Sequence, residues 1–207
     1  MFKRATVLAA LALFALATRP ALAQQVMVDI NPFGGIYFPI SDLIDQDIEG
    51  VAVKGSQKLG PLFGARVTVW LNESFGVEGG FAYAISDAEQ ELPVASDTSA
   101  NVMLATVKGL YQFAPSPGTP FMLHFGAGGA LIMHGGDAYE DLEGTMDIGA
   151  TIIFGGTYDV SDMVAIRFDA QDFMYQAKFE EEDGFETDGK FQNDLVFTGG
   201  VVIKLGR

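Results

Sequence analysis

Residues 61–84 have the sequence PLFGARVTVWLNESFGVEGGFAYA, and this stretch contains the pattern that decides the fold. Apolar side chains occupy every second position over residues 61–71, and Asn72, Glu73 and Ser74 interrupt the alternation before it resumes over residues 75–84. Because successive side chains of a β-strand point to opposite faces, a period of two predicts a strand with one apolar face. The stretch therefore predicts two strands joined by a tight turn.

The same alternation recurs along the chain from Gln24 to Arg207. Eight segments of about ten residues carry it, and a break follows each of them. Each segment alone is a weak signal, but eight in phase predict an all-β fold: an eight-stranded, up-and-down, antiparallel transmembrane β-barrel. The predicted strands are residues 26–39, 61–71, 75–84, 102–113, 121–133, 146–158, 164–175 and 195–205.

The N-terminus has the features of a cleaved export signal. Lys3 and Arg4 precede the apolar run 5–17, and Ala21 and Ala23 supply a small-x-small cleavage site. The run is shorter than the roughly 20 apolar residues that a membrane-spanning helix needs. We therefore expect residues 1–23 to be a secretory signal peptide and residues 24–207 to form the barrel, in the outer membrane of a Gram-negative bacterium.

Composition excludes several classes of protein. The formal net charge is −15, which argues against nucleic acid as a partner because phosphate binding requires a basic face. The chain has no cysteine, so neither disulfides nor thiolate metal sites hold the fold. Residues 24–207 suffice for eight strands with loops but not for a porin of about 16 strands.

The connections between the predicted strands alternate in length, and this predicts the orientation. Connections 72–74, 114–120 and 159–162 are short, whereas those after the first, third, fifth and seventh strands are long and acidic. Small outer-membrane barrels have short periplasmic turns and longer external loops, so we expect the acidic loops to lie outside the cell. Aromatic residues flank the short turns, as in an interfacial girdle: Trp70, Phe75, Tyr111, Phe113, Phe121 and Tyr158.

The inward positions of the predicted strands carry charges that nearly balance. In the simplest register Glu78 lies opposite Lys108, and closure of the barrel brings Asp29 near Lys204. A buried charge without a partner is very unfavourable, so we expect these charges to pair in the lumen and to close it. The predicted lumen charge cluster, a structural plug, contains Asp29, Arg66, Glu78, Lys108, His124, Arg167, Asp169 and Lys204.

The outer half of the predicted lumen is apolar instead, and it allows two interpretations. The side chains could pack as ordinary barrel filling, or they could form a shallow cup for a small hydrophobic molecule. The inward positions concerned are Ala82, Val102, Leu104, Ala130, Ile132, Phe173 and Val196.

Two stretches carry a family resemblance. The segments GARV at 64–67 and FGVEGGF at 75–81, together with PFMLHFGAGGA at 120–130, resemble the small outer-membrane barrels of the OmpA/OmpX type. A more distant similarity to OmpW-type barrels implies a hydrophobic ligand. Family members usually end in an aromatic residue that helps the barrel-assembly machinery, whereas this chain ends Leu205-Gly206-Arg207. The outward alternation includes Leu205, which could replace that residue.

Catalysis and metal binding find little support in the sequence. His124 and His134 share the inward face of one strand without an adjacent serine, so we expect a plug residue and a rim residue, and no enzyme. The acidic loops lack EF-hand spacing, and we expect no cofactor or resident metal.

The expected partners are therefore outer-membrane lipid, lipopolysaccharide (through divalent ions or without them) and the assembly machinery, around a monomer. Two functions stay open: a structural or surface-interaction role with a plugged lumen, or binding and uptake of a small hydrophobic molecule. A soluble exported barrel of the lipocalin type is a third interpretation, but it would turn the apolar face inward. That arrangement conflicts with Arg66, Glu78, Lys108 and Arg167, which lie opposite the larger apolar face.

Overall fold

The structure is a computed structural model, and it describes residues 27–40, 44–48, 51–90, 97–137, 142–143, 145–177, 180–181 and 190–206. The predicted export signal, residues 1–23, lies outside these residues, as do parts of the acidic loops. Within the described residues there is no helix long and apolar enough to cross a membrane.

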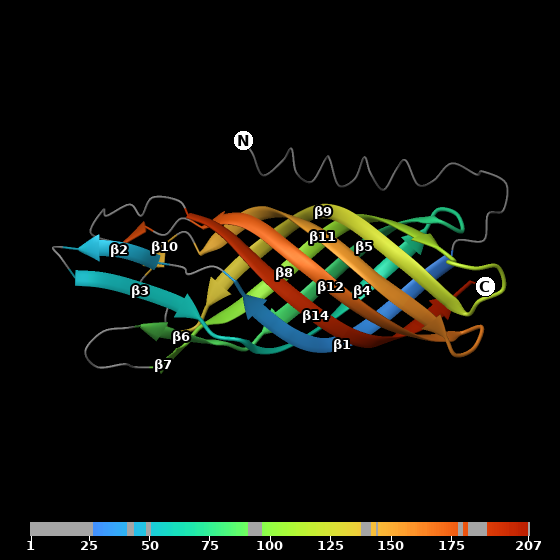
Figure 1. Ribbon diagram of the computed structural model, residues 1–207, viewed down its shortest axis with the longest axis horizontal. Coiled ribbons are helices and arrows are strands. Elements are labelled where there is room, and N and C mark those ends of the chain that lie inside the picture. Colours follow the sequence, from blue (N-terminus) through green and yellow to red (C-terminus); the bar gives the residue numbers. More distant parts are fainter. Residues whose placement is uncertain are drawn as a thin grey trace, which may run out of the picture.

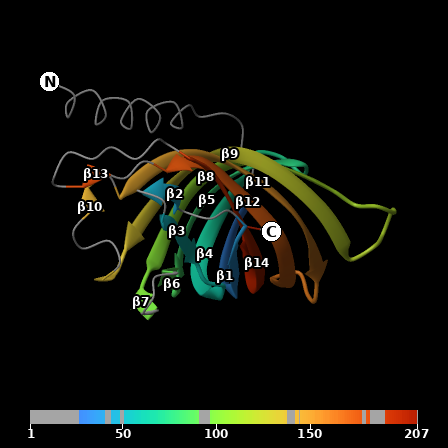
Figure 2. The same ribbon diagram turned by 60° about the vertical axis from the view of Figure 1, so that its left-hand side comes forward.

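Eight strands form one closed antiparallel barrel, as predicted (Figure 1). The first and last strands pair with each other, which closes the sheet, and the wall curves around a single interior (Figure 2). The strand order around the barrel is β1-β14-β12-β11-β9-β8-β5-β4. Their bounds are β1 Met27–Pro39, β4 Gly60–Trp70, β5 Phe75–Ala84, β8 Asn101–Phe113, β9 Phe121–Gly135, β11 Met146–Asp159, β12 Val164–Ala177 and β14 Lys190–Leu205.

The observed bounds of the second to seventh barrel strands agree with the predicted bounds to within two residues. The eighth strand, β14, differs most, because it begins at Lys190 rather than at residue 195. The alternation extends to the first residues of β14, where the polar side chains of Gln192 and Asp194 point inward and are buried. An apolar–polar pattern cannot reveal a strand end whose inward side chains are polar.

The two ends of the barrel differ, and we name them by their connections. At the turn end, short connections join β4 to β5, β8 to β9 and β11 to β12. In the first of these, the Asn72 side-chain oxygen accepts hydrogen bonds from the backbone N–H groups of Ser74 and Phe75, at 2.9 and 2.8 Å. This side-chain-to-backbone pattern is typical of a tight turn.

At the opposite end, the loop end, parts of the predicted acidic loops are paired strands. Strands β2 Ile44–Ile48, β3 Val51–Gln57, β6 Asp87–Gln90 and β7 Asp97–Ser99 form a four-stranded sheet. Strands β10 Leu142–Glu143 and β13 Glu180–Glu181 form a two-stranded sheet. The four-stranded sheet projects beyond the barrel (Figure 1). The sequence analysis treated these segments as acidic connections and missed their pairing, because the charged residues obscure the alternation there.

The two faces of the wall have opposite character. Large apolar side chains such as Val107 (66% exposed) and Phe168 (65% exposed) face outward, whereas Glu78 is completely buried inside. This is the reverse of a lipocalin-like barrel, whose apolar side chains turn inward. The outward alternation is confirmed on all eight strands, with exposed apolar residues such as Phe81, Phe125, Ile152, Ile166 and Val201.

The predicted aromatic girdle needs one correction. Phe75 and Tyr111 pack on the outer face with ring centroids 4.9 Å apart, but Trp70 points inward and is buried. Its Nε1 donates a hydrogen bond of 2.7 Å to Asp29 Oδ2. Trp70 shares the inward parity of Arg66 in the same strand, so the alternation itself excludes it from the outer face.

Candidate functional site

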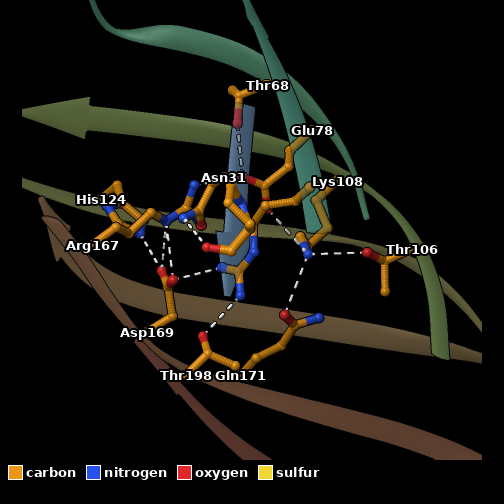
Figure 3. Close-up of polar contacts among 12 residues, drawn as sticks. Asn31, Thr68, Glu78, Thr106, Lys108, His124, Arg167, Asp169, Gln171 and Thr198 are labelled. Atoms are coloured by element: carbon orange, nitrogen blue, oxygen red, sulfur yellow. Dashed lines mark hydrogen bonds and ion pairs between the residues drawn. The ribbon is translucent and has the colours of Figure 1, made fainter. Parts of the chain in front are cut away.

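A network of buried charged side chains crosses the barrel interior (Figure 3). The contributing strands are β4 with Arg66, β5 with Glu78, β8 with Lys108, and β12 with Arg167 and Asp169. Each of these side chains lies at an inward position and is buried. We call this set, together with His124 of β9, the plug.

Arg167 holds both carboxylates of the plug. Its Nη1 donates a 2.6 Å hydrogen bond to Glu78 Oε2, and its Nε lies 3.0 Å from both carboxylate oxygens of Asp169. Arg66 contributes a second cation, since its Nη1 donates to Asp169 Oδ2 at 2.5 Å. Charge-assisted hydrogen bonds of this kind are the strong ones, so Arg167 and Asp169 form the centre of the network.

Glu78 and Lys108 lie directly opposite each other on β5 and β8, the register that the sequence predicts. Their charged atoms are 3.3 Å apart, and Lys108 Nζ also donates to Thr106 at 3.1 Å and to Gln171 at 3.3 Å. Thr68 of β4 donates to Glu78 at 2.8 Å. Glu78 thus has two cationic neighbours, of which only Lys108 was expected.

A glycine makes room for the contact between His124 and Asp169. His124 Nε2 lies 2.5 Å from Asp169 Oδ1, and Gly155 of β11 stands opposite His124 in register. A Cβ atom at Gly155 would lie 2.6 Å from His124 Nε2 and would overlap Asp169 Oδ1. The absence of a side chain at this position therefore allows the two to meet.

The remaining two residues of the predicted cluster lie nearer the turn end. Asp29 and Lys204 are register partners on β1 and β14, but the ion pair of Lys204 Nζ is with Asp159 Oδ1 of β11. Asp159 was predicted to begin a turn and was not counted as a lumen residue. It shares the inward parity of Thr151 and Thr157, which was the signal that could have found it.

A second polar group lies near the loop end, and most of it was not predicted. Asp194 Oδ2 accepts hydrogen bonds from the hydroxyl groups of Tyr37 at 2.7 Å and Tyr175 at 2.9 Å. The Tyr175 hydroxyl also lies 3.3 Å from His134 Nε2. His134 was expected to be a rim residue, and its side chain is buried. This group escaped prediction because Asp194 precedes the predicted eighth strand.

An apolar layer separates the plug from this loop-end group. The seven residues of the predicted cup are at most 7% exposed, and they pack together in one core cluster with Leu62 and Tyr37. A cavity of only about 20 Å³ lies between this layer and the plug, beside Arg66, Leu104 and Phe173. Of the two interpretations, ordinary interior packing describes these side chains in the structure.

Metal ligands do not gather in the described part of the chain. No group of three or more histidine or acidic side chains there is arranged to hold an ion. Several acidic loop residues, among them Asp42, Glu91 and Asp183, lie outside the described residues.

Comparisons at the level of sequence find no relative: no protein-family model matches the chain, and no curated protein matches it. Comparisons of structure do find similar proteins. The outer membrane protein OprG of Pseudomonas aeruginosa has a TM-score of 0.66 and 12% sequence identity, with 88% of this chain and 97% of that chain covered.

Two further solved structures are similar to this chain. The outer membrane protein AlkL has a TM-score of 0.60 and 12% identity, covering 92% of this chain and 96% of that chain. The Escherichia coli outer membrane protein W has a TM-score of 0.54 and 15% identity, covering 88% and 100%. The resemblance to small outer-membrane barrels is thereby confirmed for the fold, an eight-stranded antiparallel barrel of the OmpA, OmpX and OmpW kind.

Proposed function

We propose that this protein is a monomeric β-barrel of the Gram-negative outer membrane with a structural or surface-interaction role and without an open channel. The observation that carries the proposal is the plug, a network of buried ion pairs inside a barrel whose outer face is apolar. The turn end faces the periplasm and the acidic loop end faces outward, in accordance with the usual arrangement of such barrels.

The membrane location is supported by the chemistry of the outer face. Exposed apolar side chains occur on all eight barrel strands, and a wall of this kind is stable in hydrocarbon. The predicted export signal and the similarity to the outer membrane proteins OprG and AlkL support the same location.

Closure of the lumen is supported by the number of strands that contribute to the plug. Its residues come from β4, β5, β8, β9 and β12, so the network spans the interior from side to side. The interior of an eight-stranded barrel is just wide enough for side chains to fill it. An ion would have to break the contact between Arg167 and Glu78, which joins opposite sides of the wall, in order to pass.

Membrane fractionation combined with planar-bilayer recording tests the proposal. The full chain, expressed with its export signal, should be recovered in the outer-membrane fraction. After purification and insertion into a planar bilayer it should give no steady conductance steps. Regular steps from the unmodified protein would contradict the plugged lumen, and recovery in the soluble periplasmic fraction would contradict the membrane location.

The second candidate function is binding or uptake of a small hydrophobic molecule, which the apolar layer beneath the loop end favours. Entry of a ligand would require Leu104, Ile132 and Phe173 to move apart, because they are packed and buried. Saturable binding of a fluorescent naphthylamine probe, abolished by Ala82→Trp, would support this function. If the probe binds equally well to the Ala82→Trp variant, its binding site is the outer surface of the barrel or the micelle and not the lumen.

The partners follow from the same arrangement. We propose contacts of the acidic loop end with lipopolysaccharide, which divalent ions could bridge, and recognition of the barrel strands by the assembly machinery. A catalytic role is not proposed: His124 contacts Asp169 and His134 contacts Tyr175, which supports structural roles for both histidines.

A further inference from the structure

A groove lies on the outer face of the barrel wall, across β8, β9, β11 and β12. Its volume is about 880 Å³, and pockets that hold a small molecule typically have about 300–1,000 Å³. We propose that this groove binds one hydroxylated acyl chain of lipopolysaccharide, with Asp172 as the acceptor for the hydroxyl group of the chain. The proposal rests on the membrane location and orientation of the proposed function, and it adds a site on the wall to the contacts at the loop end.

Small side chains form the floor of the groove. Gly109 of β8 pairs with Ala127 of β9, and both are exposed on the outer face. Aromatic side chains of the next row form the side of the groove nearer the turn end: Tyr111, Phe125 and Phe154. A hydrocarbon chain that lies over Gly109 and Ala127 would contact these rings as well as the floor, and such contacts are individually weak but collectively large.

The groove descends from Asp172 towards the middle of the membrane. One row of register partners crosses four strands and contains Asp172, Ile152, Ala127 and Gly109. Three steps of about 4.8 Å between strands give this row a length of roughly 14 Å. A rise of about 3.3 Å per residue and a tilt of about 40° place Asp172 roughly 20 Å from the turn end along the barrel axis, and Gly109 roughly 10 Å. Because the apolar band of such barrels is about 25 Å tall, Asp172 lies just inside its loop-end boundary.

Asp172 gives the groove its chemical preference. Among the lining residues, which all belong to the described part of the chain, Asp172 alone is charged. Its carboxylate accepts hydrogen bonds from the Asn193 side chain and from the backbone of Phe173. A carboxylate has about four acceptor sites, so capacity for a further hydrogen bond remains. Since a carboxylate in hydrocarbon is unfavourable unless it is hydrogen-bonded, a chain that carries a hydroxyl group at this depth fits the groove better than a plain chain.

The same lining distinguishes lipopolysaccharide from an ordinary phospholipid. No basic side chain lines the groove in the described structure, so a phosphate group there would meet only the carboxylate of Asp172. The acyl chains of an ordinary phospholipid carry no hydroxyl group. The chains attached directly to the sugars of lipopolysaccharide carry one close to the headgroup, so that the donor lies just inside the apolar band while the phosphates stay above it. This is the depth of Asp172.

Groove-filling variants of the purified, folded protein test the site. Gly109→Leu fills the floor, and Ala127→Leu is a second variant there. Gly79→Leu is the matched control, because Gly79 is also exposed on a barrel strand and a Cβ at either glycine meets nothing within 4 Å. The probe is N-(3-hydroxymyristoyl)glucosamine, and native mass spectrometry in dodecyl maltoside micelles measures its binding. Its affinity should fall roughly tenfold in Gly109→Leu and stay unchanged in the control. Equal affinity for both variants would overturn the site.

A second probe tests the role of Asp172. N-Myristoylglucosamine has the same sugar, amide and chain length but lacks the hydroxyl group. The unmodified protein should bind the hydroxylated probe roughly tenfold more tightly, and Asp172→Leu should abolish this preference without unfolding the barrel. Absence of a preference in the unmodified protein would overturn the assignment of the hydroxylated chain. A dimer that disappears in Gly109→Leu would assign the groove to a second copy of this chain and would also overturn the proposal.

These measurements use purified protein in micelles, so they do not depend on where the cell places the barrel. Recovery of the unmodified protein in the soluble periplasmic fraction would contradict the proposed membrane location, whatever the probes show. Recovery in the outer membrane together with equal probe binding by all the variants would overturn the groove site alone.

Discussion

Glu78 and Arg167 lie 89 residues apart in the chain and are joined by a hydrogen bond of 2.6 Å that crosses the barrel interior. In the strand order, β5 and β12 are separated by three strands on either side, so they stand opposite each other in the wall. The contact therefore spans the lumen, whereas the Glu78–Lys108 pair joins neighbouring strands.

This difference predicts unequal coupling energies. Glu78→Gln should destabilise the barrel by about 3–5 kcal/mol, because it leaves Arg167 and Lys108 short of a counter-charge in a buried site. In double-mutant cycles measured by urea unfolding, coupling of Glu78 with Arg167 should exceed its coupling with Lys108, which lies 3.3 Å away. Simple additivity of Glu78→Gln and Arg167→Gln would show that the cross-lumen contact contributes nothing to stability.

The charge-swapped pair Glu78→Lys with Lys108→Glu gives a second test. The swap restores opposite charges between β5 and β8, so it should recover part of the stability lost in either single variant. Recovery should be incomplete because the new lysine at 78 would face Arg167. Full recovery would mean that Arg167 is not a close neighbour of position 78.

Gly155 provides a steric prediction. Gly155→Ala should cost about 1–3 kcal/mol, because the added methyl group would overlap Asp169 and the backbone carbonyl oxygen of Phe168 and would press on His124. Gly79→Ala and Gly109→Ala are matched controls in barrel strands, since a Cβ at either position meets nothing within 4 Å. Urea unfolding midpoints compare the three variants. A loss at the control positions as large as that at Gly155 would indicate a general intolerance of alanine rather than crowding at Gly155.

The apolar outer face predicts how introduced side chains respond to the bilayer. Val107→Arg should destabilise the inserted barrel by about 2–4 kcal/mol if the position lies at mid-membrane. Val107→Cys and Ile152→Cys should react with membrane-dissolved thiol probes and resist water-soluble reagents. Glu181→Cys, at the loop end, should label readily on intact cells. If water-soluble reagents label the folded Val107→Cys and Ile152→Cys variants readily, the outer face does not lie in lipid and the membrane assignment is wrong.

A carboxylate, that of Asp172, interrupts the apolar outer face of the barrel. Asp172 of β12 lies at an outward position, with Ile152 and Leu195 as its register partners on the two neighbouring strands. Asp172→Leu should therefore raise the free energy of unfolding in bilayers, by on the order of 1 kcal/mol, because removing a carboxylate from an apolar surface outweighs the loss of its hydrogen bond to Asn193. Asp162→Leu in an exposed turn is the control and should change little. A destabilised Asp172→Leu variant would indicate that the carboxylate has a structural role.

Features that depend on neighbouring residues in the sequence could be predicted, whereas contacts between distant strands could not. The period-two pattern at Phe75–Ala84 is local, so the sequence alone reveals the strand and its outward face. The partner of Arg167 depends instead on which inward side chains meet across a closed barrel, and neighbouring-strand register cannot supply that. Trp70 and Asp159 show a different cause: each has the inward parity of its own strand, but its position beside a turn suggested an interfacial or turn residue.

The β6–β7 pairs continue the β5–β8 ladder without a change of register: Ala84 pairs with Val102, and farther out Asp87 pairs with Ser99. If one residue is removed from each of the two arms, β6 and β7, the pairing between β5 and β8 in the barrel is unchanged. An unmatched deletion would shift one arm by a residue and turn its side chains to the other face. Length changes within the paired arms of β6 and β7 should therefore come in even steps, which lets the outer surface diversify while the barrel beneath keeps its register.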